Sequence, residues 1–218
     1  MENQPPNATH VVARLLRHEV GDLLQAVYAT VAVLLDRLAP GAAPERLLLD
    51  NLRQRAELCR FELDAVVDLV CPDAASEQRV EVDRLVASSL AQVVPRFPHL
   101  GFDTTPFPAS AIRADGRLAA GAITFLLLAV CQHARRRVAV RLESADGLAR
   151  VRIHRDGPGV DDEQQAWIDR PFTTTRQSML GLALAVTGRA IGPGGGRVAV
   201  SNQAGGVEVL LESPICPT

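Results

Sequence analysis

Apolar residues in the first third of the chain recur at the threes and fours of amphipathic helices. In segment 11–38 they form one stripe, made of Leu16, Val20, Leu23, Val27, Val31, Leu34 and Leu38. In segment 44–70 they alternate fours and threes, as in the seam of a helical bundle, at Leu52, Ala56, Cys59, Leu63, Val66 and Val70. Residues 40–44, PGAAP, break the pattern between them. The first third is therefore predicted to be an antiparallel helical hairpin.

Both predicted helices carry a strong apolar seam. Two helices joined by a short turn bury only one face of each against the other. A second copy of the hairpin would cover the remaining apolar surface in a four-helix bundle. We therefore expect a homodimer.

After Cys71 the pattern changes from helical spacing to alternation. Residues 72–79 are polar and typical of a linker. Four later stretches alternate with the period of two expected for half-buried strands, namely VAVRLES, ARVRIHR, RVAVSNQ and VEVLLES. Helical spacing returns between them in segments 82–94, 117–134 and 180–190.

These elements predict an α+β chain with two domains. Residues 1–71 would form a helical dimerisation domain. Residues 80–218 would form a two-layer α/β sandwich, in which helices pack on one mixed sheet.

Charge and hydropathy narrow the possible partners. The net charge is −2, so no electrostatic attraction to nucleic acid or to an anionic membrane is expected. The apolar run from Leu118 to Cys131 is shorter than the ~20 residues that a transmembrane helix needs. The polar start MENQPPNATH has no signal-peptide core, and a cytoplasmic protein is expected.

The four cysteines are widely spaced along the chain. They are Cys59, Cys71, Cys131 and Cys216. Without a C-x-x-C pair or clustered histidines, they indicate neither a disulfide framework nor a zinc site. Buried free thiols are expected.

The order of hairpin, linker and sandwich, with RLLRHEVGDLLQAV in the first helix, resembles the dimerisation and ATP-binding core of two-component sensor histidine kinases. A motif of that family, H-[ED]-x-x-N-x-L-Q, is similar to residues 18–25, with Asp22 in the usual Asn or Thr position. The resemblance implies that His18 is the phosphoacceptor and that Glu19 fixes its tautomer. It also implies that a receiver domain docks near Gly21, Asp22 and Gln25.

Helical spacing gives an independent reason to consider His18. One polar face, opposite the Leu16 stripe, carries Arg14, His18, Asp22, Gln25 and Ala29. The imidazole should therefore project into solvent. A neutral imidazole nitrogen is a competent nucleophile near neutral pH.

The second domain resembles the nucleotide-binding domain of the same family, but several nucleotide-contacting positions differ. Where the family has N-x-x-x-N-A, alignment on His133 places Phe125 and Ala129 at the two asparagines, and neither offers Mg²⁺ an oxygen. Where the family has D-x-G-x-G, Gly157 and Gly159 match the glycines and Arg155 takes the place of the adenine-reading aspartate.

Asp156 falls at the variable place of that motif and would read adenine only after a one-residue rearrangement of the loop. In the G-x-G-L-A box, Met179 replaces the first glycine and Gly181 keeps the second. Residues 171–175 are similar to the phenylalanine box, and only residues 176–178 remain for the lid.

Asp156, Gly157, Gly159 and Gly181 are thus expected to form a vestigial nucleotide site. Its cleft should be filled by Phe125, Arg155 and Met179, and the chain should hold no metal of its own.

The resemblance then implies a histidine phosphotransferase, similar to those of bacterial phosphorelays. It would exchange a phosphoryl group between His18 and a response-regulator receiver aspartate, without a cofactor of its own, because the receiver supplies Mg²⁺. Two alternatives stay open. One is an active histidine kinase that uses ATP and Mg²⁺ at a divergent site, and the other is a non-catalytic dimeric adaptor.

Overall fold

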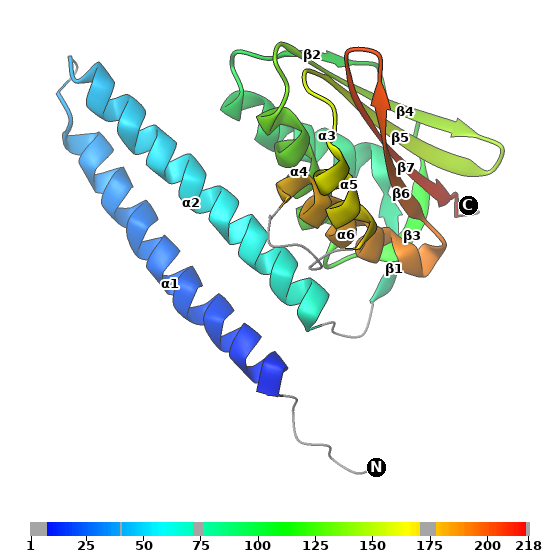
Figure 1. Cartoon of the computed structure of the whole chain (residues 1–218), viewed down its shortest axis with the longest axis horizontal. Coiled ribbons are helices and arrows are strands. Elements are labelled where there is room, and N and C mark those ends of the chain that lie inside the picture. The colour runs from blue at the N-terminus through cyan, green and yellow to red at the C-terminus, as the bar shows by residue number, and fades with distance from the viewer. Residues whose placement is uncertain (1–7, 40, 72–75, 171–177, 217–218) are drawn as a thin grey trace. The chain divides into compact units, whose positions relative to one another are not determined.

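The computed structural model describes residues 8–39, 41–71, 76–170 and 178–216. The chain divides into two compact units, Met1–Asp73 and Ala74–Thr218 (Figure 1). Each unit is described below by itself.

The first unit is a hairpin of two long helices. Helix α1 spans Ala8–Arg37 and helix α2 spans Ala43–Val70, and the two run side by side in opposite directions (Figure 1). Pro44 lies in the first turn of α2, where a missing N–H costs nothing because that group would have no helical partner. The predicted hairpin is confirmed.

The seam of the hairpin buries only part of the predicted apolar stripe. Val31 of α1 and Ala56 of α2 are buried, and so is Leu24 of α1, which lies outside the predicted stripe. Several stripe residues and their neighbours instead remain 45–68% exposed, namely Leu16, Leu23 and Leu34 on α1 and Leu48 and Leu52 on α2. The apolar surface of each helix is thus wider than one partner helix can cover.

The second unit contains a five-stranded mixed sheet with the order β2-β4-β5-β7-β6. Its strands are β2 (Gly101–Thr104), β4 (Arg137–Ala145), β5 (Leu148–Asp156), β6 (Arg197–Gln203) and β7 (Gly206–Pro214). Among the described strands of this sheet, only β2 and β4 pair in parallel. Strands β1 (Glu77–Glu81) and β3 (Ala111–Asp115) form a separate antiparallel pair.

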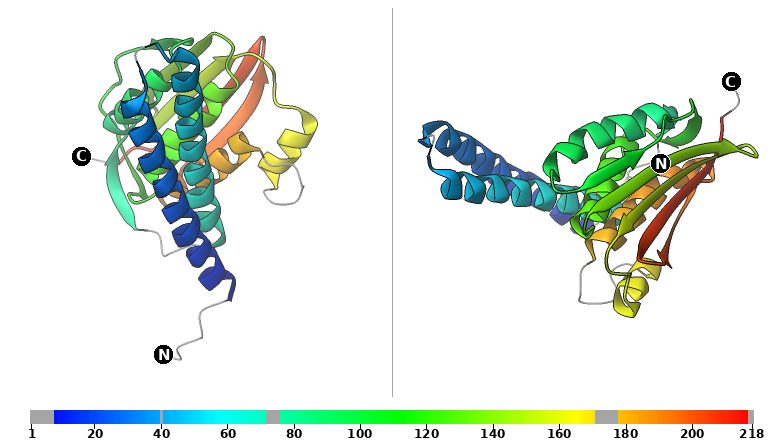
Figure 2. Two further views of the ribbon diagram at one scale, coloured as in Figure 1. Left: turned by 90° about the vertical axis from the view of Figure 1, so that its left-hand side faces the viewer. Right: turned by 90° about the horizontal axis from the view of Figure 1, so that it is seen from above.

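Three helices form the second layer. They are α3 (Val82–Val93), α4 (Ala119–Gln132) and α6 (Met179–Ile191), and they lie against one face of the sheet (Figures 1 and 2). Alternate residues of β5 and β7 are buried beneath them, including Val151, Ile153 and Val209. This arrangement confirms the predicted two-layer α/β sandwich.

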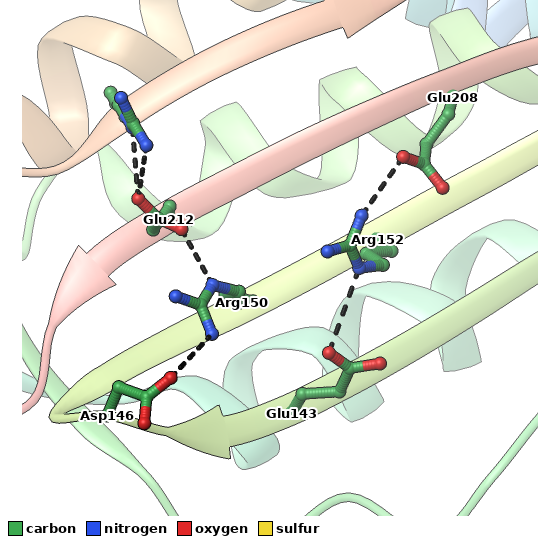
Figure 3. Close-up of polar contacts among 7 residues, drawn as sticks. Glu143, Asp146, Arg150, Arg152, Glu208 and Glu212 are labelled. Carbon is green, nitrogen blue, oxygen red and sulfur yellow. Dashed lines mark hydrogen bonds and ion pairs between the residues drawn. The ribbon is translucent and has the colours of Figure 1, made fainter.

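The opposite face of the sheet carries rows of paired charges (Figure 3). Arg150 lies between Glu212, at 2.7 Å, and Asp146, at 3.9 Å. Arg152 lies between Glu208, at 3.1 Å, and Glu143, at 3.7 Å. Because side chains alternate along a strand, the same strands supply both the apolar core and this charged face.

Some elements were not predicted from the sequence. Strand β1 begins at Glu77, within the expected linker, so the sandwich unit starts before residue 80. Its exposed sequence EQRVE has little apolar alternation. Strands β2 and β3 and the short helix α5 (Asp162–Asp169) were also missed, because their patterns are too short to stand out.

The expectation of buried thiols is right for Cys71 and Cys131 and wrong for Cys59, which is exposed. Burial raises the pKa of Cys131 to about 12. Cys59 follows exposed Leu52 by seven residues, so the two residues share one exposed side of α2. In the part of the chain that the structure describes, no helix is both long and apolar enough to span a membrane.

Candidate functional site

His18 lies in the first half of α1, and its side chain is open to solvent. Its side chain is 72% exposed, as is that of Asp22. The two residues are four apart, so they occupy neighbouring turns on one face of the helix. His18 Nδ1 lies 3.3 Å from Asp22 Oδ2. A protein partner can reach the imidazole without any rearrangement of the hairpin.

The other residues proposed from the motif differ in their surroundings. Gln25 is exposed on the face of His18, and Gly21 is half-buried with open space where a Cβ would stand. Glu19 is exposed, and it makes no hydrogen bond or ion pair with any described residue. The structure therefore brings Asp22, rather than Glu19, to the imidazole.

In the second unit, α4 is buried on every side along most of its length. Phe125 is 1% exposed and Ala129 is fully buried, so both side chains belong to the core. Thr124 carries a nearby hydroxyl, which donates a hydrogen bond to Ser89 Oγ at 3.0 Å within the helix layer. Neither Phe125 nor Ala129 can give a metal ion an oxygen ligand.

Arg155 lies near the end of β5 and is only 3% exposed. Its Nη1 donates a hydrogen bond to the His133 carbonyl oxygen at 3.1 Å, and its Nε finds no acceptor among the described residues. Burial lowers the pKa of Arg155 below its usual value. A buried guanidinium has only donors, so it cannot accept a hydrogen bond from an adenine amino group.

Asp156 is occupied by the backbone of its own unit. Its Oδ1 accepts hydrogen bonds from three consecutive N–H groups, those of Arg135, Arg136 and Arg137, at 2.9–3.0 Å. Partial burial acts to raise the pKa of this carboxyl, but the three donors outweigh it and hold the pKa below its usual range. The carboxylate fastens the start of β4 to the end of β5.

The glycines that follow fit tightly against their neighbours. Gly157 has φ +114°, and a Cβ there would stand 2.8 Å from the His133 carbonyl oxygen. A Cβ on Gly159 would stand 2.9 Å from Asn202 Oδ1. Both positions therefore need glycine for the packing of the loop itself.

Gly181 lies in the first turn of α6, where Ser178 is the N-cap. The Gly181 N–H donates a hydrogen bond to Ser178 Oγ at 3.1 Å, and both residues are buried. Met179 is half-buried beside them. The predicted phenylalanine box and the first two residues of the predicted lid, residues 171–177, lie outside the described residues.

An apolar pocket lies elsewhere in the second unit. It is lined by residues of α3, β3, α4 and the sheet, among them Val86, Ile112, Ile123, Ala149 and Ser213. Ala149 stands at the beginning of β5, whereas Arg155 and Gly157 stand at its end. None of Phe125, Arg155, Gly157 or Gly181 lines this pocket.

A helical hairpin followed by this α/β sandwich is the fold of a sensor histidine kinase core. The mycobacterial sensor histidine kinase MprB is similar over 65% of this chain and 99% of its own, at 24% identity and a TM-score of 0.54. The Acinetobacter baumannii histidine kinase AdeS is similar over 91% of this chain and 96% of its own, at 15% identity and a TM-score of 0.57.

A third solved structure, full-length ShkA in complex with AMPPNP, is similar over 97% of this chain at 23% identity and a TM-score of 0.62. This chain spans 47% of the length of that protein. No family model matches the sequence, and no curated protein matches it. The resemblance to the histidine kinase core is thus confirmed at the level of the fold.

Proposed function

We propose that this protein is a two-component signalling protein that acts as a histidine phosphotransferase. In this proposal His18 exchanges a phosphoryl group with a receiver aspartate of a response regulator, and the protein binds little or no ATP. The observation that carries the proposal is the open imidazole of His18 on a histidine-kinase fold, in which buried Phe125 and Arg155 stand where the family's motifs have nucleotide-contacting residues.

The surface around His18 suits a docking protein. The exposed residues Asp22 and Gln25 lie on its face of α1, and half-buried Gly21 presents no side chain beside it. A receiver domain that docks over this face would bring its aspartate to the imidazole. Phosphoryl transfer depends mainly on positioning and on neutralising charge, so the hairpin need contribute little beyond the nucleophile.

The second unit does not fit ATP with Mg²⁺. Phe125 and Ala129 offer no oxygen, and Arg155 offers no acceptor for adenine. The Asp156 carboxylate and the Gly181 N–H are both engaged in bonds within the unit. We regard Asp156, Gly157, Gly159 and Gly181 as the remains of a nucleotide site that now stabilise the fold.

The exposed apolar residues of the hairpin support a homodimer. Leu16, Leu23 and Leu34 share one side of α1, at spacings of seven and eleven, and Leu48 and Leu52 share one side of α2. We call this surface, made of Leu16, Leu23, Leu34, Leu48 and Leu52, the open apolar face. A second hairpin packed on it would complete a four-helix bundle, and we propose the cytoplasm as its compartment.

Incubation with a receiver carrying ³²P on its aspartate tests the proposal. We expect label to appear on the wild-type protein and to be absent from His18→Ala, while His10→Ala on the same helix keeps it. Wild-type protein that stays unlabelled, or His18→Ala labelled to the same extent, would reject the proposal.

An active kinase is the second candidate, favoured by the AMPPNP complex of ShkA, which is similar to almost the whole chain. Calorimetric titration with Mg²⁺-ATP separates the two candidates. We expect no measurable binding, and micromolar affinity together with γ-phosphate label on His18 would establish the kinase instead.

A further inference from the structure

We infer that Asp22, rather than Glu19, is the positioning residue for His18: it holds the Nδ1 proton and leaves Nε2 as the atom that takes the phosphoryl group. The inference rests on the proposed function and specifies the atom on which the phosphoryl group is carried. It changes the roles implied by the motif, where Glu19 was expected to fix the tautomer and Asp22 to contact the partner.

The contact between His18 and Asp22 is specific to one ring nitrogen. Asp22 Oδ2 lies 3.3 Å from His18 Nδ1. An ionised carboxylate can only accept a hydrogen bond, so a hydrogen bond between these two atoms requires the proton on Nδ1. In the neutral ring the lone pair then stands on Nε2, the nitrogen at the outer end of a side chain that is 72% exposed.

Glu19 is placed where its carboxylate cannot accept a hydrogen bond from His18 Nδ1. Residues i and i+1 are separated by about 100° around a helix, so their side chains do not face each other. Glu19 makes no hydrogen bond or ion pair with any described residue. It points toward the side of α1 that carries Leu16 and Leu23, at the border of the open apolar face.

With the proton on Nδ1, phosphoryl transfer from the receiver aspartate to Nε2 balances in bonds and charge. The Nε2 lone pair attacks the phosphorus of the receiver acyl phosphate, an N–P bond forms, the P–O bond to the aspartate breaks, and that aspartate leaves as a carboxylate. No proton moves, because the Nδ1 proton stays in place and the ring becomes positively charged. The Asp22 carboxylate then faces an imidazolium.

The same contact assists the reverse step. When phosphoryl returns to a receiver aspartate, the leaving group is a neutral imidazole only if Nδ1 keeps its proton. The exposed contact between the neutral ring and the Asp22 carboxylate contributes little before transfer, but the attraction grows into that of an ion pair as the ring gains charge. Asp22 therefore stabilises the transition state, in which the ring carries positive charge, more than it stabilises the neutral ring before transfer.

The tautomer of His18 tests the inference without any phosphoryl transfer. Long-range ¹H–¹⁵N NMR on protein labelled in its histidine rings distinguishes the Nδ1–H from the Nε2–H form. We expect Nδ1–H in the wild type and in Asp36→Asn, a matched change of another exposed carboxylate on α1. Asp22→Ala should return the ring to the Nε2–H form that isolated imidazole side chains prefer, whereas Glu19→Ala should not.

The phosphorylated atom gives a second readout. Phosphoramidate, a small phosphoryl donor, replaces the receiver, and ³¹P NMR distinguishes the two phosphohistidine isomers. We expect phosphoryl on Nε2 in the wild type, about 10-fold slower labelling in Asp22→Ala, and partial rescue in Asp22→Glu.

A wild-type Nε2–H tautomer, or a tautomer that responds to Glu19→Ala and not to Asp22→Ala, would overturn the inference. The proposed function fails in a different way. A receiver that never labels His18, in a protein whose tautomer is as expected, refutes the phosphotransferase and leaves the role of Asp22 on the imidazole intact.

Discussion

Asn202 and Val160 are joined by two hydrogen bonds that tie β6 to the loop after β5. The Val160 N–H donates to Asn202 Oδ1 at 2.7 Å, and Asn202 Nδ2 donates to the Val160 carbonyl oxygen at 2.9 Å. The side chain thus takes the place of a strand partner for one residue of the loop. These two bonds hold the Asn202 side chain beside Gly159, the residue that precedes Val160.

Loss of the Asn202 side chain should loosen this loop. Asn202→Ala removes both bonds and leaves the buried Val160 backbone groups without their partner, which we expect to cost about 1–3 kcal/mol in the free energy of unfolding. Urea denaturation followed by circular dichroism measures this. Gln203→Ala is the matched control, because that exposed side chain bonds only Ser201 nearby. Equal losses in the two variants would contradict the prediction.

Gly157→Ala should destabilise the second unit more than Gly147→Ala does. Both glycines have positive φ, +114° and +73°, so both variants bear backbone strain of about 1–3 kcal/mol. Only at Gly157 would the new Cβ also meet a backbone oxygen, that of His133 at 2.8 Å, whereas at Gly147 the space is open. Thermal denaturation of the two variants gives the comparison, and a larger loss for Gly147→Ala would disprove the role of the close contact.

The hydrogen bonds of Asp156 predict a dependence on pH. Because they lower the pKa of the folded carboxyl below its unfolded value of 3.8, their contribution is present above that pH and is lost as the pH falls through it toward the folded pKa. Asp156→Asn keeps an acceptor oxygen without the charge, and we expect it to be about 1 kcal/mol less stable than the wild type at pH 7.

The difference between wild type and Asp156→Asn should narrow as the pH falls from about 5 to below 3.8. Urea titrations of both proteins at pH 7, 5 and 3.5 measure it. A difference that stays constant or widens in acid would show that the charge of Asp156 is not what the three N–H groups of Arg135, Arg136 and Arg137 stabilise.

Elements with a sustained apolar period could be predicted from the sequence, and short ones could not. Helices α1, α2, α4 and α6 and strands β4 to β7 were found to within a few residues, because each repeats its period several times. The sequence of strand β1 is typical of a linker, since its pairing with β3 depends on residues at least thirty positions away. No local pattern encodes that partner.

The same distinction holds for the candidate site. The exposure of His18 followed from helical spacing, and the contact with Asp22 is also local, at i and i+4. The partners of Asp156 and Arg155 lie about twenty residues away, in the turn between α4 and β4 and at the first residue of β4. Sequence alone could show that Arg155 replaces a carboxylate, but not that its guanidinium bonds the His133 carbonyl.

The open apolar face predicts a dimer that a single substitution of leucine by aspartate would dissociate. Leu16 and Leu52 are about half exposed in the single chain and lie on this face. If a second hairpin covers it, Leu16→Asp or Leu52→Asp loses roughly 1.5–3 kcal/mol of burial in each copy, so about 3–6 kcal/mol in a symmetric pair. The dissociation constant of the dimer should then rise at least 100-fold.

Leu47→Asp is the matched control for that experiment. Leu47 is 62% exposed, yet it lies about 140° around α2 from Leu52 and outside the open apolar face. Sedimentation equilibrium should give twice the chain mass for the wild type and for Leu47→Asp, and a single chain mass for Leu52→Asp. A monomeric wild type would remove the dimer from the proposal. Loss of the dimer in Leu47→Asp alone would place the interface on the other side of the hairpin.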